Sequence, residues 1–270
     1  LVRLSAMDAP CPDAIIALAQ HMADASGEIL RRYFRAAVVA EDKPDQSPVT
    51  IADRETEETL RGMIEAEFPE HGIIGEEFGE TRTEADYVWT LDPLDGTAAF
   101  ITGKPLFGTL IGLLHEGVPV FGIIDHPITR ERWMGGRGLA ATCNDEKVKT
   151  RTCGDLSQAM LYATTPHMFS GDAARAFEHL CRAVKRPQYG ADCYAYGLLA
   201  SGLIDLVAET TMKVCDYCAL VPVVEAAGGI ITDWGGKPLG LDSDGSVLAA
   251  GDGDLHKQAL AVLGEGMGTA

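Results

Sequence analysis

The sequence has no long hydrophobic run and no surplus of positive charge. None of its apolar stretches approaches the roughly 20 residues that a helix needs to span a bilayer. Lys and Arg number 22 against 40 Asp and Glu, which gives a formal net charge of −18. This balance argues against nucleic acid or an anionic membrane as the main partner, because both bind basic surfaces. A small phosphorylated molecule still fits, since bound cations can reverse the local charge.

The chain also lacks the cysteine pattern of a disulfide framework. Its seven cysteines are an odd number and are scattered through 270 residues. Such usage favours buried thiols of a reduced, cytoplasmic protein over disulfide bonds. Leu1–Ala6 lack the layout of a signal peptide; these residues precede Met7 and are left out of the predicted fold.

The composition is that of a globular chain with a substantial core. Hydrophobic residues make up 46 % and charged residues 23 %, and the length suits one large domain or two small ones. In the first half, periodicity predicts helices at 12–34 and 51–68 and strands at 71–74, 87–91, 109–114, 118–124 and 132–143. Helices followed by an antiparallel run of strands indicate an α+β arrangement. On the second helix, Glu57 and Arg61 have the spacing of an i,i+4 ion pair.

Strands and helices alternate in the second half. The predicted strands are 160–164, 204–209, 230–234 and 246–250, and the predicted helices are 171–184, 193–200, 216–227 and 254–263. This is α/β layering. We therefore predict an N-terminal α+β half at 7–148 and a C-terminal α/β half at 149–265, sharing a broad interface.

Three acidic groups fall where predicted strands or loops meet helices. They are Glu76 with Glu77, Asp92 with Asp95, and Asp216. Each alone is commonly a turn or a helix cap, and only their combination is informative. Carboxylates without accompanying His or metal-spaced Cys favour hard cations such as Mg²⁺ or Mn²⁺. The Gly96-Thr97 pair can open a short helix whose N–H groups favour a phosphate.

Together these motifs resemble the inositol monophosphatase-like phosphatases. The matching segments are Gly75-Glu76-Glu77, Leu91-Asp92-Pro93-Leu94-Asp95-Gly96-Thr97, and the pattern D-x-x-A-L-x-P-V-V-E-A-A-G-G that begins at Asp216. The resemblance covers about residues 12–263. It implies a layered αβαβα sandwich of the inositol monophosphatase and fructose-bisphosphatase type. It also implies Mg²⁺-dependent phosphomonoesterase activity on a small-molecule phosphate ester, sensitivity to lithium, and a homodimer.

Within this family the chain looks like the histidinol-phosphate phosphatase branch. The segments that carry this similarity are 41–50, 100–105 with 108–113, and 189–197. They imply hydrolysis of L-histidinol phosphate to L-histidinol and phosphate, a step of histidine biosynthesis. The alternative is an inositol-1-monophosphatase or a related sugar-phosphate phosphatase. A non-catalytic regulatory member is a third reading, against which the intact acidic motifs speak.

The resemblance assigns metal ligands residue by residue. Glu76, Asp92 and the Leu94 carbonyl would hold a first Mg²⁺ ion; Asp92, Asp95 and Asp216 would hold a second, with Asp92 bridging. Glu76 would reach a weak third ion, so two or three ions are expected, and Mn²⁺ could replace Mg²⁺. One departure is Cys215, where the family often has Trp; the resulting Cys215-x-x-Cys218 is a weak sign of a zinc or redox site.

The remaining implied roles concern phosphate, water and substrate. The N–H groups of Gly96 and Thr97 would cradle the phosphate, while the Thr97 hydroxyl and Asp53, with Glu76, would position and deprotonate the attacking water. Asp192 and Glu209 would face the organic half of the substrate, Asp192 by pairing with an ammonium group; Lys43 would close over the metals from a mobile loop. Asp53 and Asp192 also fit as simple helix caps.

Overall fold

The computed structural model describes residues 11–36, 40–42 and 48–267. Leu1–Ala6 and Lys43 lie outside the described residues, so the predictions made for them are untouched by the structure. Among the described helices, none combines the length and apolarity needed to cross a membrane. All seven cysteines are free thiols, which confirms the prediction that they form no disulfide bonds.

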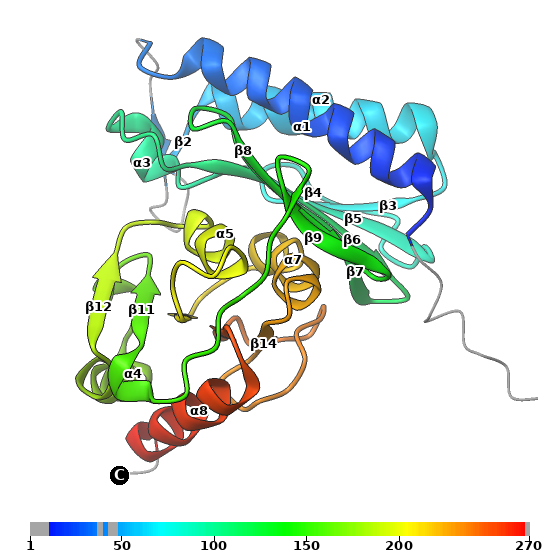
Figure 1. Cartoon of the computed structure of the whole chain (residues 1–270). Coiled ribbons are helices and arrows are strands. Elements are labelled where there is room, and N and C mark those ends of the chain that lie inside the picture. Colours follow the sequence, from blue (N-terminus) through cyan, green and yellow to red (C-terminus); the bar gives the residue numbers. More distant parts are fainter. Residues whose placement is uncertain (1–10, 37–39, 43–47, 268–270) are drawn as a thin grey trace, which may run out of the picture.

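The first half of the chain forms two long helices on an eight-stranded sheet (Figure 1). The helices are α1 (Asp13–Tyr33), α2 (Ile51–Glu67) and the short α3 (Thr97–Ile101). The strands are β3 (Gly72–Gly75), β4 (Gly79–Thr81), β5 (Tyr87–Asp95), β6 (Gly108–His115), β7 (Val118–His126), β8 (Glu131–Gly136), β9 (Leu139–Cys143) and β10 (Glu146–Lys147). They follow the order β10-β9-β8-β7-β6-β5-β3-β4, and only β3 and β5 pair in parallel. A separate antiparallel pair joins β1 (Glu41–Asp42) to β2 (Pro48–Val49).

The second half forms a five-stranded sheet with helices on both faces. The strands are β11 (Met160–Ala163), β12 (Arg186–Tyr189), β13 (Leu206–Glu209), β14 (Ile230–Thr232) and β15 (Val247–Ala250). The helices are α4 (Gly171–Ala183), α5 (Tyr194–Ala200), α6 (Val214–Tyr217), α7 (Leu220–Ala226) and α8 (Gly253–Met267), with 3₁₀ turns at Leu156–Gln158 and Pro166–Met168. In the order β12-β11-β13-β15-β14, the first three strands are parallel and β15 runs antiparallel to both neighbours.

Helices and sheets alternate in five layers (Figure 1). The α1–α2 pair packs on one face of the large sheet through a cluster that includes Met22, Leu60 and Trp89. Helices α5 and α7 fill the space between the two sheets, in a cluster that includes Trp133 and Tyr196. Helices α4 and α8 cover the outer face of the small sheet. This arrangement confirms the predicted αβαβα sandwich. The division at 148/149 into two halves stays a prediction.

Two local predictions were wrong, and both involve proline. Strand β5 does not end at Leu91 but continues through Pro93, because its pairing with β6 shifts register between Asp92 and Asp95. A bulge of this kind is where a sheet tolerates a residue without an N–H group. The helix expected at 216–227 is split into α6 and α7, since the Pro222 ring would clash with the carbonyl four residues earlier. The short edge strand β12 was not predicted.

Two glycines in the large sheet let the α6–α7 segment approach its backbone. A Cβ atom at Gly122 in β7 would lie 2.0 Å from the Ala219 carbonyl oxygen, and one at Gly112 in β6 would lie 3.0 Å from the Ala219 nitrogen. Ala219 is the residue between α6 and α7. The spacing between the two halves is therefore set by contact of backbone with backbone.

We expect Gly122→Ala to destabilise the protein. The added methyl group cannot fit without moving α7, and overpacking of this kind costs about 1–3 kcal/mol. The measurement is the free energy of unfolding in urea. The control is Gly62→Ala in α2, where a Cβ atom has nothing within 4 Å; there we expect a gain of roughly 0.5–1 kcal/mol, because alanine is the better helix former. Equal effects of the two substitutions would contradict the proposed close approach.

Candidate active site

Asp92 is a deeply buried acid of the site. It lies in β5, is 2 % exposed, and its Oδ1 accepts a hydrogen bond of 3.0 Å from the Leu94 N–H. Burial raises the pKa of Asp92 well above its usual range, and the negative charges of Glu76, Asp95 and Asp216 raise it further. The structure thus places the four carboxylates that the sequence predicts as metal ligands close enough for the charges of the other three to act on Asp92.

Asp95 connects the two halves of the chain. Its Oδ2 accepts a hydrogen bond of 2.7 Å from the N–H of Cys193, the residue before α5. Burial, and then the charge of Asp192, raise the pKa of Asp95 well above its usual range. The Cys193 sulfur in turn lies 3.4 Å from Nε2 of the buried His126 at the end of β7. The position of Asp95 therefore depends on the backbone of the second half.

Asp216 lies in the first turn of α6 but is not the N-cap residue that the sequence suggested. The N-cap is Lys213, whose N–H donates to Asp216 Oδ2 at 2.7 Å. Burial raises the pKa of Asp216 to about 6. The neighbouring Cys215 is buried and donates its thiol to Asp216 Oδ1 at 3.4 Å. Cys215 therefore helps to orient Asp216, a role that the sequence did not indicate.

Glu76 is held by two residues that the sequence interpretation did not assign to the site. Its Oε1 lies 3.2 Å from Lys213 Nζ, in an ion pair between the two halves. The loop after Glu76 is anchored by Glu57, whose Oε2 accepts a hydrogen bond of 2.7 Å from the Glu77 N–H and whose Oε1 accepts one of 3.1 Å from the Phe78 N–H. The predicted ion pair of Glu57 with Arg61 is present at 2.8 Å. Glu57, however, is fully buried and acts as an anchor of this loop.

Asp53 and Thr97 face each other from the first turns of α2 and α3. The N-cap of α2 is Thr50, and Asp53 Oδ2 accepts hydrogen bonds from the Thr50 N–H at 2.8 Å and from the Thr50 hydroxyl at 2.7 Å. The Thr97 hydroxyl lies 3.2 Å from Asp53 Oδ1 and 3.0 Å from the Leu94 carbonyl oxygen. Its single proton can go to either acceptor. Burial raises the pKa of Asp53, although its hydrogen bonds oppose that shift.

Asp192 lies against Gly96 at the start of α3. A Cβ atom at Gly96 would lie 3.3 Å from Asp192 Cγ, and Gly96 has a φ of 84°, a conformation that suits glycine. Burial, and then the charge of Glu209, raise the pKa of Asp192 to about 6, while Lys104 opposes the shift. Lys104 donates to the Gly190 carbonyl two residues before Asp192. Asp192 has a φ of 48°, so it occupies a left-handed turn ahead of α5 and is not a helix cap.

Glu209 is 3 % exposed, and its charge acts on Asp192. Its Oε1 accepts a hydrogen bond of 2.8 Å from the Thr164 N–H, and its Oε2 accepts one of 2.8 Å from the Tyr196 hydroxyl. Burial raises the pKa of Glu209. Both oxygens are thus engaged within the protein, which makes Glu209 a positioning residue for its neighbours.

The donor set has the chemistry of a site for hard divalent cations. Asp92, Asp95, Asp216 and Glu76 offer only carboxylate oxygens, and the Leu94 carbonyl oxygen accepts from the Thr97 hydroxyl. Carboxylate and carbonyl oxygens are the ligand types that Mg²⁺ and Mn²⁺ prefer. Within the described ranges, no three Asp, Glu, His or Cys side chains are placed so that they could hold one ion as they stand. Each aspartate is instead oriented by a backbone N–H group. The residues therefore fit the expected cations, because their oxygen ligands are of the right type and the charges of Glu76, Asp95 and Asp216 all act on Asp92.

The sequence pointed to the acids but missed the residues that hold them. Cys193, Tyr196 and Lys213 each contact a residue that the sequence predicts for the site, and Glu57 holds the N–H groups of the loop just after Glu76. A signal was present for Glu57, because it lies four residues after Asp53 on the same face of α2.

Known proteins share both the sequence and the fold. Residues 12–267 match the model of the inositol monophosphatase family. The chain is 52 % identical over 260 residues to a bifunctional phosphatase, IMPL2, chloroplastic, of Arabidopsis thaliana, covering 93 % of this chain and 75 % of that protein. It is 34 % identical over 261 residues to a histidinol-phosphatase of Mycobacterium tuberculosis, covering 94 % and 98 %.

A solved structure of an inositol monophosphatase from Zymomonas mobilis superposes with a TM-score of 0.87 at 45 % sequence identity, covering 93 % of this chain and 98 % of that one. The family match spans nearly the whole chain and includes the acidic motifs of β5 and α6. Because the family model matches residues 12–267 and a solved member of that name shares the fold, the chain belongs to the inositol monophosphatase family.

Proposed function

We propose that this metal-dependent phosphatase hydrolyses L-histidinol phosphate to L-histidinol and phosphate. The observation that carries the proposal is the carboxylate of Asp192 beside Gly96. A substrate phosphate held at Gly96 and Thr97 would have this acid close to its ester oxygen. In L-histidinol phosphate the ammonium group sits on the carbon next to the one that bears the ester oxygen. The short spacing therefore suits an amino-alcohol phosphate better than a neutral polyol phosphate.

Two residues are arranged to handle the attacking water. Asp53 keeps one carboxylate oxygen on Thr50 and presents the other to the Thr97 hydroxyl. When Thr97 donates its proton to Asp53, the lone pairs of its oxygen can accept a proton from a water. Thr97 then orients that water, and Asp53, with its raised pKa, is suited to accept the proton that the water loses.

We assign the metal ions to Glu76, Asp92, the Leu94 carbonyl, Asp95 and Asp216. Bound divalent cations would supply the positive charge that neutralises a phosphate dianion and favours a deprotonated water. The four acids provide the negative potential that attracts such ions, and hydrogen bonds from Leu94, Cys193 and Lys213 keep the aspartates oriented. Magnesium is the metal we propose, with two or three ions.

An inositol-1-monophosphatase or a related sugar-phosphate phosphatase is the second candidate, because the Zymomonas structure is that of an inositol monophosphatase. The decisive experiment compares kcat/KM for L-histidinol phosphate and for myo-inositol 1-phosphate, by phosphate release from the Mg²⁺-loaded protein. We expect L-histidinol phosphate to be preferred by about tenfold or more, a difference of about 1.4 kcal/mol. Preference for inositol 1-phosphate would reject the histidinol assignment while leaving the phosphatase intact. Absence of activity on any phosphate ester would favour a regulatory protein.

We expect Asp95→Asn to lower kcat by several orders of magnitude without unfolding the protein. The amide oxygen can still accept the Cys193 N–H, but the site loses one negative charge that the ions require. Because burial and Asp192 both disfavour the charged form of Asp95, the metal-free variant should be at least as stable as the parent in urea. Asp242→Asn, which makes the same change on the exposed surface, is the control and should leave kcat unchanged. Unchanged turnover in Asp95→Asn would remove this residue from the site.

We expect Asp192→Asn to act on the substrate with the ammonium group. Asparagine tolerates the left-handed conformation at this position, so the turn should persist. Loss of a charge-assisted contact costs roughly 1.5–3 kcal/mol. The variant should therefore lower kcat/KM for L-histidinol phosphate by about 10- to 100-fold and leave that for β-glycerophosphate nearly unchanged. Equal losses on both substrates would contradict the ammonium contact.

The pH dependence gives the same test a second readout. The pKa of Asp192 is raised to about 6, so the carboxylate is charged above that pH and neutral below it. The ratio of kcat/KM for L-histidinol phosphate to that for β-glycerophosphate should fall as the pH drops through about 6. The phosphate group of both substrates titrates in the same range, and the ratio cancels it. In Asp192→Asn the ratio should no longer depend on pH.

Two further expectations accompany this proposal. The free thiols favour a reducing compartment such as the cytoplasm. The homodimer implied by the family stays a prediction that light scattering can test.

A further inference from the structure

Lys213 links the two halves of the chain at the acid cluster. It is the N-cap residue of α6, and its N–H donates to Asp216 Oδ2 at 2.7 Å. Its Nζ reaches back to the first half, where it lies 3.2 Å from Glu76 Oε1. Burial raises the pKa of Asp216 to about 6, and the hydrogen bond and the charge of Lys213 oppose that rise. One residue therefore acts on two of the four acids that we assign to metal ions.

Glu76 is the acid through which a counter-charge has the widest effect. After burial, the negative charge of Glu76 is the largest cause that raises the pKa of Asp92, and it also raises that of Asp216. A positive charge placed on Glu76 therefore relieves repulsion across the cluster. The Lys213 ammonium is such a charge, and it comes from the protein itself.

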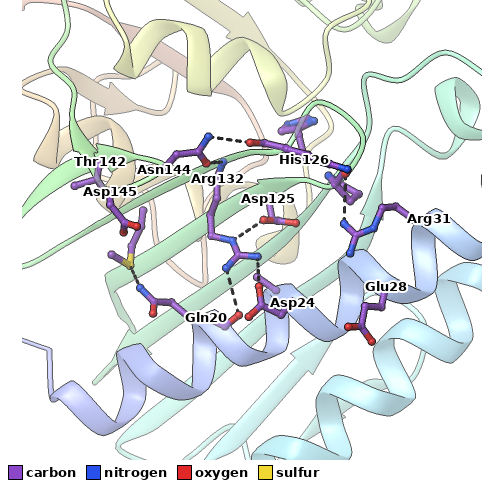
Figure 2. A pocket seen from close by; sticks show the side chains of 14 residues that line it. Gln20, Asp24, Glu28, Arg31, Asp125, His126, Arg132, Thr142, Asn144 and Asp145 are labelled. Atoms are coloured by element: carbon purple, nitrogen blue, oxygen red, sulfur yellow. Dashed lines mark hydrogen bonds and ion pairs between the residues drawn. The ribbon is translucent and has the colours of Figure 1, made fainter.

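An ion pair that serves as a fixed part of the fold has a different geometry in this protein. Arg132 in β8 lines a cavity of about 500 Å³ beside α1, where its Nε lies 2.6 Å from Asp125 Oδ1 and its Nη2 lies 2.8 Å from Asp24 Oδ1 (Figure 2). The Arg132 side chain is 26 % exposed. The Lys213 side chain is 47 % exposed, and its contact with Glu76 is longer. Because exposed pairs add little to stability, the Lys213 ammonium can leave Glu76 at small cost.

Lysine suits a contact that is made and broken. Its ammonium is a compact charge on a flexible four-carbon stem, without the planar fork of arginine. The backbone of Lys213 stays in place when the side chain moves, since its N–H remains on Asp216. The loop that carries Glu76 is likewise held, because Glu57 accepts the two N–H groups that follow. Release of Glu76 therefore requires a movement of the lysine side chain and not of the fold.

We propose that Lys213 is a built-in counter-ion of the metal site and sets its affinity for the divalent ion that Glu76 holds. In the metal-free protein the Lys213 ammonium neutralises Glu76. When a divalent cation binds there, Lys213 must give up Glu76 or repel that cation, so it lowers the affinity of the site. The inference rests on the metal assignment within the proposed function, but not on which phosphate ester is hydrolysed.

Calorimetric titration of the metal-free full chain with Mg²⁺ tests the proposal without any substrate. We expect Lys213→Gln to bind Mg²⁺ about tenfold more tightly than the parent, because the competing charge is gone while the N–H to Asp216 remains. Lys213→Arg keeps the charge and should bind no more tightly than the parent. Lys257→Gln on the exposed surface of α8 removes the same charge away from the site and should leave the affinity unchanged.

Two further variants secure the reading. Lys213→Met keeps the length of the side chain without its charge, and it should show the same gain in Mg²⁺ affinity as Lys213→Gln. In a Glu76→Gln background the ion pair is already lost. There Lys213→Gln should change the Mg²⁺ affinity by less than about threefold, because the contact on which the effect depends is absent.

Three results would overturn the proposal while leaving the metal assignment in place. The first is an unchanged or weaker Mg²⁺ affinity in both Lys213→Gln and Lys213→Met. The second is an equal gain in the Glu76→Gln background, which would mean that Lys213 does not act through Glu76. The third is a rise in KM for the phosphate ester with no change in Mg²⁺ affinity, which would make Lys213 a substrate contact. If the parent binds no Mg²⁺ below about 10 mM, the metal assignment is wrong and this inference with it.

Discussion

The close approach of the α6–α7 segment to the large sheet is the constraint on which the rest of the site depends. At Gly112 and Gly122 the sheet presents bare backbone, and Ala219 lies directly on it. This contact brings Asp216 from the second half of the chain to Asp92 in the first. A second contact between the halves, the hydrogen bond from the Cys193 N–H to Asp95, also holds an acid of the first half against the second half. The carboxylate cluster is thus positioned mainly by backbone groups, which cannot rotate away as side chains can.

That geometry carries an electrostatic cost. Asp92 and Asp95 are buried close to other acids, and burial raises the pKa of each. Burying like charges is unfavourable unless positive charge or hydrogen bonds offset it. The protein supplies one N–H donor to each aspartate and the Lys213 ammonium to Glu76. The remaining negative potential is what gives the site affinity for cations, so part of the stability of the fold is given up for function.

Much of the fold, but less of the site, could be predicted from the sequence. The long elements have clear periods of 3.6 or 2, and α1, α2 and the β6–β7 hairpin lie close to where periodicity put them. Predictions failed where tertiary context overrode a local rule. Pro93 would normally end a strand, yet the bulge accommodates it, whereas Pro222 divides a helix whose apolar pattern runs on.

Within the site, motifs identified the acids, but spacing could not reveal their supports. The i,i+4 spacing of Glu57 and Arg61 is the same for a surface ion pair and for a buried anchor, so only packing distinguishes them. Lys213 and Cys193 contact residues that are 137 and 98 positions away, across the two halves.

The bare backbone at Gly112 and Gly122 also has a consequence for the order of events on the ribosome. All eight strands of the large sheet have been synthesised once Lys147 has emerged, but α6 and α7 follow only on the order of several seconds later. Until then the nascent sheet displays a flat face of uncovered peptide groups beside the acids of β5. Exposed apolar surface on an incompletely folded chain is prone to aggregation. The speed of translation between Lys147 and Ala226 therefore bears directly on how much of this protein reaches its native state.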